Sequence, residues 1–536
     1  MLSGTGSVYL DDAFARKKGM RYICARHEAA AVAMAEAAAK LKNTIGVSVV
    51  TTGPGGANAI PGAIEAWVDS VPMLIISGQV KREHYIKDRA FGIQGFNIID
   101  NVKNFTKYSV LLTDPNLIRY HLERAVYEAR SGRPGPAWID IPMDLQSTEV
   151  DVDNLPGFLP LEQAENKKNS FNFDSFVGLL SSSKRPVVAF GKGVKLSESN
   201  ERLINFLESF NIPAVSARMA NDVMPFSHNN YFGMAGIRGR RSAVKVMKNA
   251  DLLIILGSSA CHTFFGLNGE GLANDCKLVV VDIDKKIFKR KDLDIHLGIQ
   301  TDLNKFFDYF EEKQSFLKEV INFKSWLDVC HDIKYKNPTV TEDLKENPIN
   351  SYYLAECLGK LTGPKHIFTN DAGSSNYISS QALELNNGQR ELTSGAFYTM
   401  GLTLPLAIGA AVTEPDSQII AITGDGSIEL NIQELQTINL NNLNIKIFVI
   451  NNGGYASIRD SQDAMCGGRY TDDEQILNFK KIAHAFDLEF EIIQSADELE
   501  SSIKNVLSND KPTLIEVVCD SNQYMIEPIR EMEENL

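Results

Sequence analysis

The chain has 536 residues, of which 44% are hydrophobic and 23% charged, a balance typical of a folded protein with several domains. Its 54 Lys and Arg against 68 Asp and Glu give a net charge of −14, which argues against nucleic acid or an anionic membrane as a partner. Seven scattered cysteines without CxxC spacing, and the lack of a signal peptide or membrane-spanning run, predict a soluble protein of the reducing cytoplasm without disulfides or structural zinc.

Short apolar, β-branched runs recur along the chain, each followed by a glycine-containing turn or a helical pattern. Strands that are apolar on both faces are typical of parallel sheets covered by helices, so the pattern predicts the α/β class. The predicted strands are residues 47–52, 73–77, 137–141, 187–191, 252–257, 278–282, 367–371, 419–424 and 445–451.

Two polar stretches interrupt this pattern and are interpreted as linkers, residues 151–170 and residues 331–350. Each segment between them is long enough to bury its own core. Cutting the chain there predicts three doubly wound parallel-sheet domains, which are residues 1–150, 165–330 and 345–536.

Two polar loops follow neighbouring predicted strands near the C-terminus. One reads Gly424-Asp425-Gly426-Ser427, and the other begins with Asn451-Asn452 and continues with two glycines. The ends of parallel strands meet at one edge of a sheet, so a carboxylate, an amide oxygen and a glycine-rich backbone are expected together. These groups suit Mg²⁺ bound to a diphosphate. Either loop alone is more often an ordinary turn, but the pair after two buried strands favours a binding site.

This pair of loops resembles the cofactor signature of thiamine-diphosphate-dependent enzymes, in particular the acetohydroxyacid (acetolactate) synthase-like family. The resemblance covers most of the chain and implies pyrimidine-binding, central and diphosphate-binding domains in that order. It implies that Mg²⁺ is bound by Asp425, Asn452 and the backbone carbonyl of Gly454. It also implies that further residues of three loops contact the cofactor: Gly373, Ser374 and Ser375; Gly424, Gly426 and Ser427; and Tyr455 and Ala456.

Glu28 begins an Ala-rich helical pattern near the N-terminus. An acid in the first turn of a helix is commonly explained by the helix dipole. However, residues 47–79 resemble the family's pyrimidine-binding domain, and Glu28 stands where the family has its activating glutamate. The resemblance implies that Glu28 hydrogen-bonds the aminopyrimidine of the cofactor and makes it reactive. It places Pro54, Gly55 and Asn58 beside the pyrimidine and Gln94 close to the reacting centre.

Met400, which follows Thr399, matches the bulky family residue that holds the cofactor in a bent shape, although an ordinary core methionine explains it equally well. Thr399 is expected to contact the cofactor beside it. Glu28 and Asp425 fall in different predicted domains. In the family the pyrimidine domain of one subunit meets the diphosphate domain of its partner, so the resemblance implies a homodimer or a dimer of dimers.

The sequence departs from the family pattern in three places. The helix and strand that normally precede the segment matching residues 3–6 are not present, so we expect an incomplete first sheet with an exposed edge. Residues 233–259 resemble the segment along flavin, but residues 258–263 replace an Arg-containing stretch, which leaves FAD open. Ser461 stands where typical synthases carry a Trp that selects the acceptor.

The last departure weakens a role in branched-chain amino-acid synthesis and favours relatives that join an acyl unit to a sugar ketone. Arg459 is then a candidate contact for a phosphate or carboxylate of the substrate, unless it is an exposed helix residue. We expect decarboxylation of a 2-oxo acid, with pyruvate as first candidate, and addition of the acyl unit to a carbonyl acceptor. Two alternatives stay open: cleavage of a cyclic 1,2-dione with the same cofactor, and an inactive nucleotide-binding or scaffolding homologue.

Overall fold

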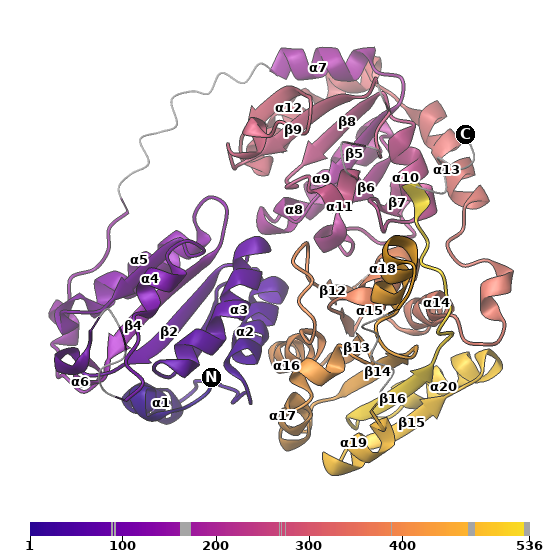
Figure 1. The fold of residues 1–536 in the computed structure, drawn as a ribbon. Helices are drawn as coiled ribbons and strands as arrows, with labels where there is room; N and C mark the ends of the chain where they lie inside the picture. The colour runs from indigo at the N-terminus through magenta and orange to yellow at the C-terminus, as the bar shows by residue number, and fades with distance from the viewer. Residues whose placement is uncertain are drawn as a thin grey trace.

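The computed structural model describes residues 1–86, 89, 93–160, 173–266, 269, 271–273, 275–386, 388–469 and 477–529. Three sheets follow one another along the chain, and Figure 1 shows each with its own flanking helices. The strand pairs of all three sheets are parallel. The α/β class predicted from the continuous apolar strands is confirmed.

The first unit is a four-stranded sheet whose central strands are buried along their whole length, as their unbroken apolar sequences predict. Its strands, in spatial order, are β1 (Gly46–Val50), β2 (Met73–Gln79), β4 (Pro136–Pro142) and β3 (Tyr108–Leu111). Its helices are α1 (Val8–Arg16), α2 (Glu28–Lys42), α3 (Pro54–Val68), α4 (Ile98–Val102), α5 (Ile118–Arg130) and α6 (Met143–Gln146).

The second unit is a six-stranded sheet with the largest aromatic core of the chain. Its strands, in spatial order, are β10 (Ile295–Gln300), β9 (Lys277–Asp282), β8 (Leu252–Leu256), β5 (Pro186–Phe190), β6 (Ala214–Ser216) and β7 (Tyr231–Met234). Its helices are α7 (Phe173–Ser182), α8 (Gly193–Leu196), α9 (Asn200–Phe210), α10 (Arg241–Lys248), α11 (His262–Phe265), α12 (Leu303–Val320) and α13 (Lys324–Lys336).

The structure tests only one of the two predicted linkers. Residues 161–172 of the first lie outside the described residues. The second begins later than residue 331, because α13 continues to Lys336 and buries Trp326, Leu327 and Cys330 in the core of the second unit. The polar composition of this segment reflects the exposed face of an amphipathic helix.

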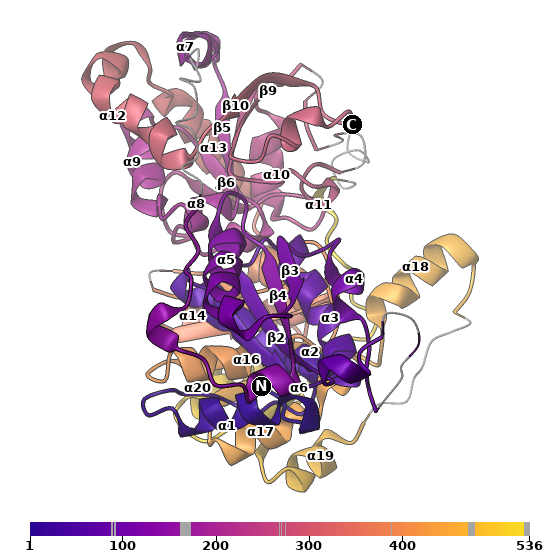
Figure 2. The same ribbon diagram turned by 90° about the vertical axis from the view of Figure 1, so that its left-hand side faces the viewer.

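The third unit is a six-stranded sheet that carries the candidate site. Its strands, in spatial order, are β12 (Arg390–Leu392), β11 (His366–Thr369), β13 (Gln418–Gly424), β14 (Ile445–Asn451), β16 (Thr513–Val518) and β15 (Glu489–Ile493). Its helices are α14 (Ser351–Leu361), α15 (Gly373–Ala382), α16 (Thr403–Thr413), α17 (Glu434–Leu440), α18 (Ala456–Cys466), α19 (Phe479–Ala485) and α20 (Leu499–Leu507). Because β11, β13 and β14 are neighbours, the loops that follow them share one edge. Figure 2 shows α18 projecting from this edge.

The first and third units share an apolar core, in which Ala30 and Ala33 of α2 join Leu404 and Ala407 of α16. Figure 1 shows these two helices side by side. The small side chains of α2 let the two helices approach closely. None of the described helices is both long and apolar enough to cross a membrane.

Candidate functional site

Asp371 joins three loops at the edge of the third sheet. Its carboxylate accepts hydrogen bonds from the Gly401 backbone N–H at 3.0 Å and from the Ser427 hydroxyl at 2.7 Å. The side chain is fully buried, and burial raises its pKa. The sequence placed this residue only at the end of a predicted strand and did not reveal that it joins the three loops. Its position directly after a buried strand was the available signal.

Asp425 is held by the backbone alone. Its Oδ1 accepts from the Gly426 N–H at 2.8 Å, and its Oδ2 accepts from Asn452 at 3.2 Å and from Gly454 at 2.9 Å. Burial raises the pKa of this carboxyl, while these N–H groups act in the opposite direction. Asp425 forms no ion pair with a Lys or Arg among the described residues. The carboxylate is therefore fixed by backbone donors without a direct ion pair, and the charge of the nearby Arg459 lowers its pKa less than burial raises it.

Asn452 lies across from Asp425 and is 8% exposed. Its Nδ2 donates to the Ser374 hydroxyl at 3.2 Å, which leaves its Oδ1 available as an acceptor. The Gly454 carbonyl accepts one hydrogen bond, from Ala456 at 2.9 Å, and has a second lone pair. The structure thus brings together the three predicted metal ligands.

The two glycines beside Asp425 have different surroundings. A Cβ at Gly426 would lie 2.5 Å from Cε1 of Tyr455, so the ring of Tyr455 packs directly on this glycine. A Cβ at Gly424 would meet nothing within 4 Å, so space is open beside the first glycine. Gly373 begins α15 with a φ of 59°, a left-handed conformation that favours glycine.

The remaining predicted diphosphate residues lie deeper. Ser375 donates to the carbonyl of Ala372 at 2.9 Å, and Ser427 is committed to Asp371 and Gly401. Both hydroxyls therefore hold the loops together in this structure. Ser374, by contrast, is half-buried and points to Asn452.

The donor set suits a magnesium diphosphate. One carboxylate, one amide oxygen and one carbonyl are hard oxygen ligands, and the open space beside Gly424 leaves room for phosphate oxygens to complete an octahedron. No group of three His, Cys, Asp or Glu that would hold a metal by itself occurs among the described residues. A hard cation at this edge would therefore share its coordination with a ligand.

The residues predicted to line a pyrimidine gather in the first unit. Glu28 is 7% exposed and accepts a hydrogen bond from Asn58 Nδ2 at 3.1 Å. Pro54 and Gly55 begin α3, and a Cβ at Gly55 would lie 3.4 Å from Glu28 Oε1. Because the Asn58 amide lies outside the core, the carboxylate and amide form a pair next to accessible space.

The backbone of Gln94 packs against Gly53, at the start of the helix that carries Asn58. Its carbonyl oxygen would be 2.3 Å from a Cβ at Gly53, the residue before α3, and its φ is 66°. Its side chain is exposed. Phe91 and Gly92 of the same motif lie outside the described residues.

Thr399 and Met400 belong to a loop that the third unit extends to the first. Thr399 donates to Glu65 Oε2 at 2.6 Å, and the Gly395 N–H donates to Asp69 Oδ1 at 3.0 Å. Burial, with the nearby charges of Asp69 and Glu36, raises the pKa of Glu65 to about 7. Met400 is half-buried. The loop is thus anchored to α3 of the first unit.

Within the chain the two groups of residues stay separate. No hydrogen bond or ion pair among the described residues links Glu28, Gly55 or Asn58 to Asp425, Asn452 or Ser374. The Glu28–Asn58 pair and the loops around Asp425 are therefore separate in the described part of the chain, and they form the two predicted half-sites.

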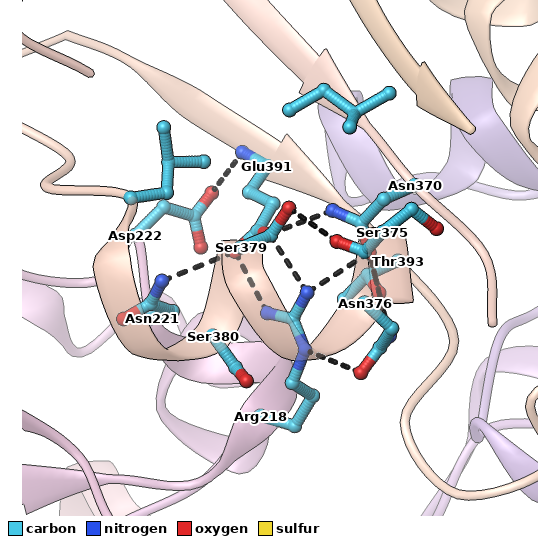
Figure 3. A network of polar contacts seen from close by, with 12 residues as sticks. Arg218, Asn221, Asp222, Asn370, Ser375, Asn376, Ser379, Ser380, Glu391 and Thr393 are labelled. Carbon is cyan, nitrogen blue, oxygen red and sulfur yellow. Dashed lines mark hydrogen bonds and ion pairs between the residues drawn. The ribbon is translucent and has the colours of Figure 1, made fainter. Parts of the chain in front are cut away.

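A buried polar network joins the second and third units next to the site, as Figure 3 shows. Arg218 donates to both carboxylate oxygens of Glu391, at 2.8 and 2.9 Å, and to Asn370 Oδ1 at 2.9 Å. Asn370 precedes Asp371 and also donates to Glu391 at 2.8 Å. The network fixes the end of β11, and no motif in the sequence indicated it.

A cavity with a volume of about 720 Å³ lies between all three units. It is lined by Asp69 from the first, Lys192 and Asp282 from the second and Tyr398 from the third. Burial lowers the pKa of Lys192 to about 7 and raises that of Asp282 to about 6. Asp425 and Asn452 do not line this cavity.

Arg459 corrects an expectation from the sequence. It is 4% exposed, so it is not an exposed helix residue, and it donates to the backbone carbonyls of Asn452, Gly453 and Ser521. Ser461 is exposed on α18 and donates to the Ser457 carbonyl at 2.9 Å.

Comparison with protein families accounts for all three units. Residues 1–108 match the family described as thiamine pyrophosphate enzyme, N-terminal TPP binding domain. Residues 173–309 match the central domain, and residues 371–517 the C-terminal TPP binding domain, of the same enzymes. The chain is therefore a thiamine-diphosphate-dependent enzyme, as its paired loops predicted.

Individual relatives show to which family of thiamine-diphosphate enzymes the chain belongs. The chain is 30% identical to the acetolactate synthase large subunit of Lactococcus lactis, over 98% of this chain and 90% of the relative. It is 31% identical to the chloroplastic acetolactate synthase 1 of Nicotiana tabacum, over 98% and 79%. The corresponding large subunit of Corynebacterium glutamicum is 30% identical, over 93% and 80%. The chain belongs to the acetolactate synthase-like family.

Proposed function

We propose that the enzyme decarboxylates a 2-oxo acid, with pyruvate as donor, and joins the acyl unit to a carbonyl acceptor. The observation that carries this proposal is the meeting of Asp425, Asn452 and Ser374 at one sheet edge, in a chain similar to acetolactate synthases over nearly its whole length. Thiamine diphosphate, when bound, supplies the electron sink for breaking and forming the carbon–carbon bonds.

The third unit would hold the diphosphate end. Asp425, Asn452 Oδ1 and the Gly454 carbonyl are proposed to bind Mg²⁺. Gly373, Ser374, Gly424 and Gly426 would face the phosphates, with Tyr455 and Ala456 closing the loop. Ser375 and Ser427 support them from behind through Ala372 and Asp371.

The first unit would hold and activate the pyrimidine end. Glu28 is proposed to hydrogen-bond the ring nitrogen and so to control a proton on the cofactor. Asn58 donates to that carboxylate, and Pro54, Gly55 and Gln94 would lie beside the pyrimidine. Met400 and Thr399 would support the cofactor from the loop anchored on Glu65.

The donor reaction is tested with purified protein, Mg²⁺ and thiamine diphosphate. Incubation with pyruvate alone should release CO₂, and chelating the metal should stop the release. Asp425→Asn serves as the inactive control. No release from the wild type at any pH would reject the decarboxylase proposal.

The acceptor is proposed to be a sugar ketone because the residue at position 461 is small. Ser461 stands where typical synthases have a Trp, and its exposed position on α18 leaves room for a bulky acceptor. A panel of keto sugars and 2-oxo acids, assayed with pyruvate, should show preference for the sugars. Ser461→Trp should reverse that preference, and equal use of both acceptor classes by wild type and variant would contradict the proposal.

The complete site is proposed to form between two subunits of a homodimer or dimer of dimers. The support is that the two half-sites share no hydrogen bond within the chain, while each is preformed. Glu28→Gln and Asp425→Asn subunits, each inactive alone, should recover about a quarter of wild-type activity when mixed, because half the dimers then contain one intact site. A site built from a single subunit would show no recovery. An active monomer in light scattering would also reject the proposal.

The cavity between the units is proposed to take a nucleotide-containing group, with FAD as the candidate. Its volume suits such a ligand, and the strand ends of the second sheet present Gly191, Gly193 and Asp282 to it. The residues after Gly257 differ from those expected of flavin-binding relatives. Purified enzyme should be yellow and release a flavin on denaturation, whereas colourless protein would reject FAD.

A further inference from the structure

Arg459 is a buried cation whose position the reaction does not explain. It lies in the first turn of α18, directly after the loop that contains Asn452 and Gly454. Its guanidinium is directed back at that loop rather than towards solvent. Removing an Arg from water is costly, so its contacts are expected to have a structural purpose.

The guanidinium holds successive carbonyl groups. Nη2 donates to the Asn452 carbonyl at 2.7 Å, and Nη1 donates to the carbonyl of Gly453. Nη2 also reaches the Ser521 carbonyl at 3.4 Å, in the segment after β16. The planar, forked donor geometry of Arg suits adjacent acceptors, and a Lys ammonium does not reproduce it.

These contacts give the loop two distinct sides. The N–H groups of Asn452 and Gly454 are directed at Asp425, whereas the carbonyls of Asn452 and Gly453 are directed at Arg459. Gly453 and Gly454 have φ values of 80° and 102°, so the loop lacks the backbone pairing of a helix or strand. Its conformation therefore depends on side chains on both sides.

The carbonyl of Gly454 is the first one beyond the reach of the guanidinium. It accepts from Ala456 and keeps one lone pair for a cation. Because Arg459 engages the two preceding carbonyls, the oxygens of residues 452–454 that are left for a cation are Asn452 Oδ1 and the Gly454 carbonyl.

We propose that Arg459 is a positioning residue of the magnesium site, acting through the backbone of residues 452–454. The proposal rests on the proposed binding of magnesium thiamine diphosphate. Groups that orient metal ligands without touching the metal commonly change metal affinity by about 10–100-fold when removed.

The test compares Arg459→Met and Arg459→Lys with the wild type in the full-length enzyme. Two quantities are measured at saturating thiamine diphosphate. The first is the Mg²⁺ midpoint, which is the concentration that gives half of the thermal shift. The second is the Mg²⁺ concentration that gives half of the maximal turnover. Arg459→Met should raise both by about 10–100-fold. Arg459→Lys should recover part of the loss, because an ammonium can still donate to one carbonyl.

Arg240→Met is the matched control. Arg240 is equally buried and also holds a backbone carbonyl, that of Leu383 at 2.9 Å, in a different part of the structure. It should lower the melting temperature without moving the Mg²⁺ midpoint. This separates general destabilisation from an effect on the loop.

An unchanged Mg²⁺ midpoint in Arg459→Met would overturn the proposal. If Arg459→Met does not fold, the Mg²⁺ midpoint of Arg459→Lys is used instead. A midpoint equal to that of the wild type would then reject the proposal. A wild-type enzyme that shows no Mg²⁺-dependent shift would instead reject the proposed function, so the two failures are distinguishable.

Discussion

The third unit buries carboxylates in two regions and satisfies them in opposite ways. At the junction with the second unit, Glu391 accepts both arms of the Arg218 guanidinium (Figure 3). Burial alone would raise the pKa of Glu391, but the charge of Arg218 outweighs it and the pKa is lowered. At the loop edge, Asp425 accepts only backbone N–H groups and burial leaves its pKa raised.

The difference separates structure from binding. A carboxylate that is paired with a guanidinium has its charge neutralised, and at this junction the pair holds two units together. One that is fixed by neutral donors has no direct ion-pair partner and can accept a cation that arrives with a ligand. If this difference holds, substituting a carboxylate that is paired with a cation should reduce stability, and substituting one that is held by neutral donors should reduce binding or turnover.

The largest effect is expected for Glu28→Gln. Glu28 is buried and accepts from Asn58, a neutral donor, so it belongs with Asp425. Turnover should fall by about 10²- to 10⁴-fold, as expected for loss of a general acid–base group. Cofactor affinity and apoenzyme stability should stay near wild type. Glu83→Gln, on the exposed surface of the same unit, is the control, and an unchanged rate in Glu28→Gln would reject the assignment.

Glu391→Gln should instead destabilise the fold. It leaves the buried Arg218 without its counter-charge, which costs about 3–5 kcal/mol. Urea unfolding of the metal-free enzyme measures the loss. Glu489→Gln, which removes the solvent-exposed partner of Lys511, should leave the unfolding midpoint unchanged. Equal unfolding midpoints for Glu391→Gln and Glu489→Gln would show that the ion pair at the junction does not stabilise the fold.

Asp425→Asn should affect binding more than the fold. The apparent Mg²⁺ affinity should fall by at least about 100-fold, because a direct ligand is lost. The melting temperature of the metal-free protein should fall less than in Glu391→Gln, because the amide leaves at most the hydrogen bonds to one carboxylate oxygen unmade and strands no buried charge. Titration of Mg²⁺ against the thermal shift measures the affinity, and a fall in melting temperature as large as that of Glu391→Gln would contradict the comparison.

The smallest expected effect is in the pH dependence at the junction. The pKa of Glu391 is lowered from 4.5 on folding, so its ion pair stabilises the protein above the unfolded-state pKa and is lost as the pH falls through the folded-state pKa. The stability difference between wild type and Glu391→Gln should be constant above about pH 5 and shrink below it. A difference that grows on acidification would have the wrong sign.

The strands that could be predicted are those in which apolar residues run unbroken. All nine predicted strands are present to within two residues, including β2, β8, β13 and β14. The short strands β3, β6, β7 and β12 were missed because they carry too few residues for a pattern. β16, an interior strand, was missed because Glu516 interrupts its apolar run, and that glutamate accepts from Asn451 at 2.7 Å.

The site could be predicted in part, for a related reason. Asp425 and Asn452 sit at the ends of buried strands, a position that sequence reveals. Asp371 was seen only as the end of a predicted strand, and the importance of Arg218 was not visible at all. Their partners lie far away in the sequence, in Ser427 and Glu391, so no local pattern identifies them.

The sequence by itself determined the class of fold and the inventory of the cofactor site, because both depend on periodicity and on residues close to one another in the chain. Only the tertiary structure decided what each charged group does. Arg459 was a candidate substrate contact or an exposed helix residue in the sequence, and in the fold it is buried and donates to the carbonyl of Asn452. The role of a charge depends on which distant groups surround it and on how far water is excluded, and only the packed structure specifies those conditions.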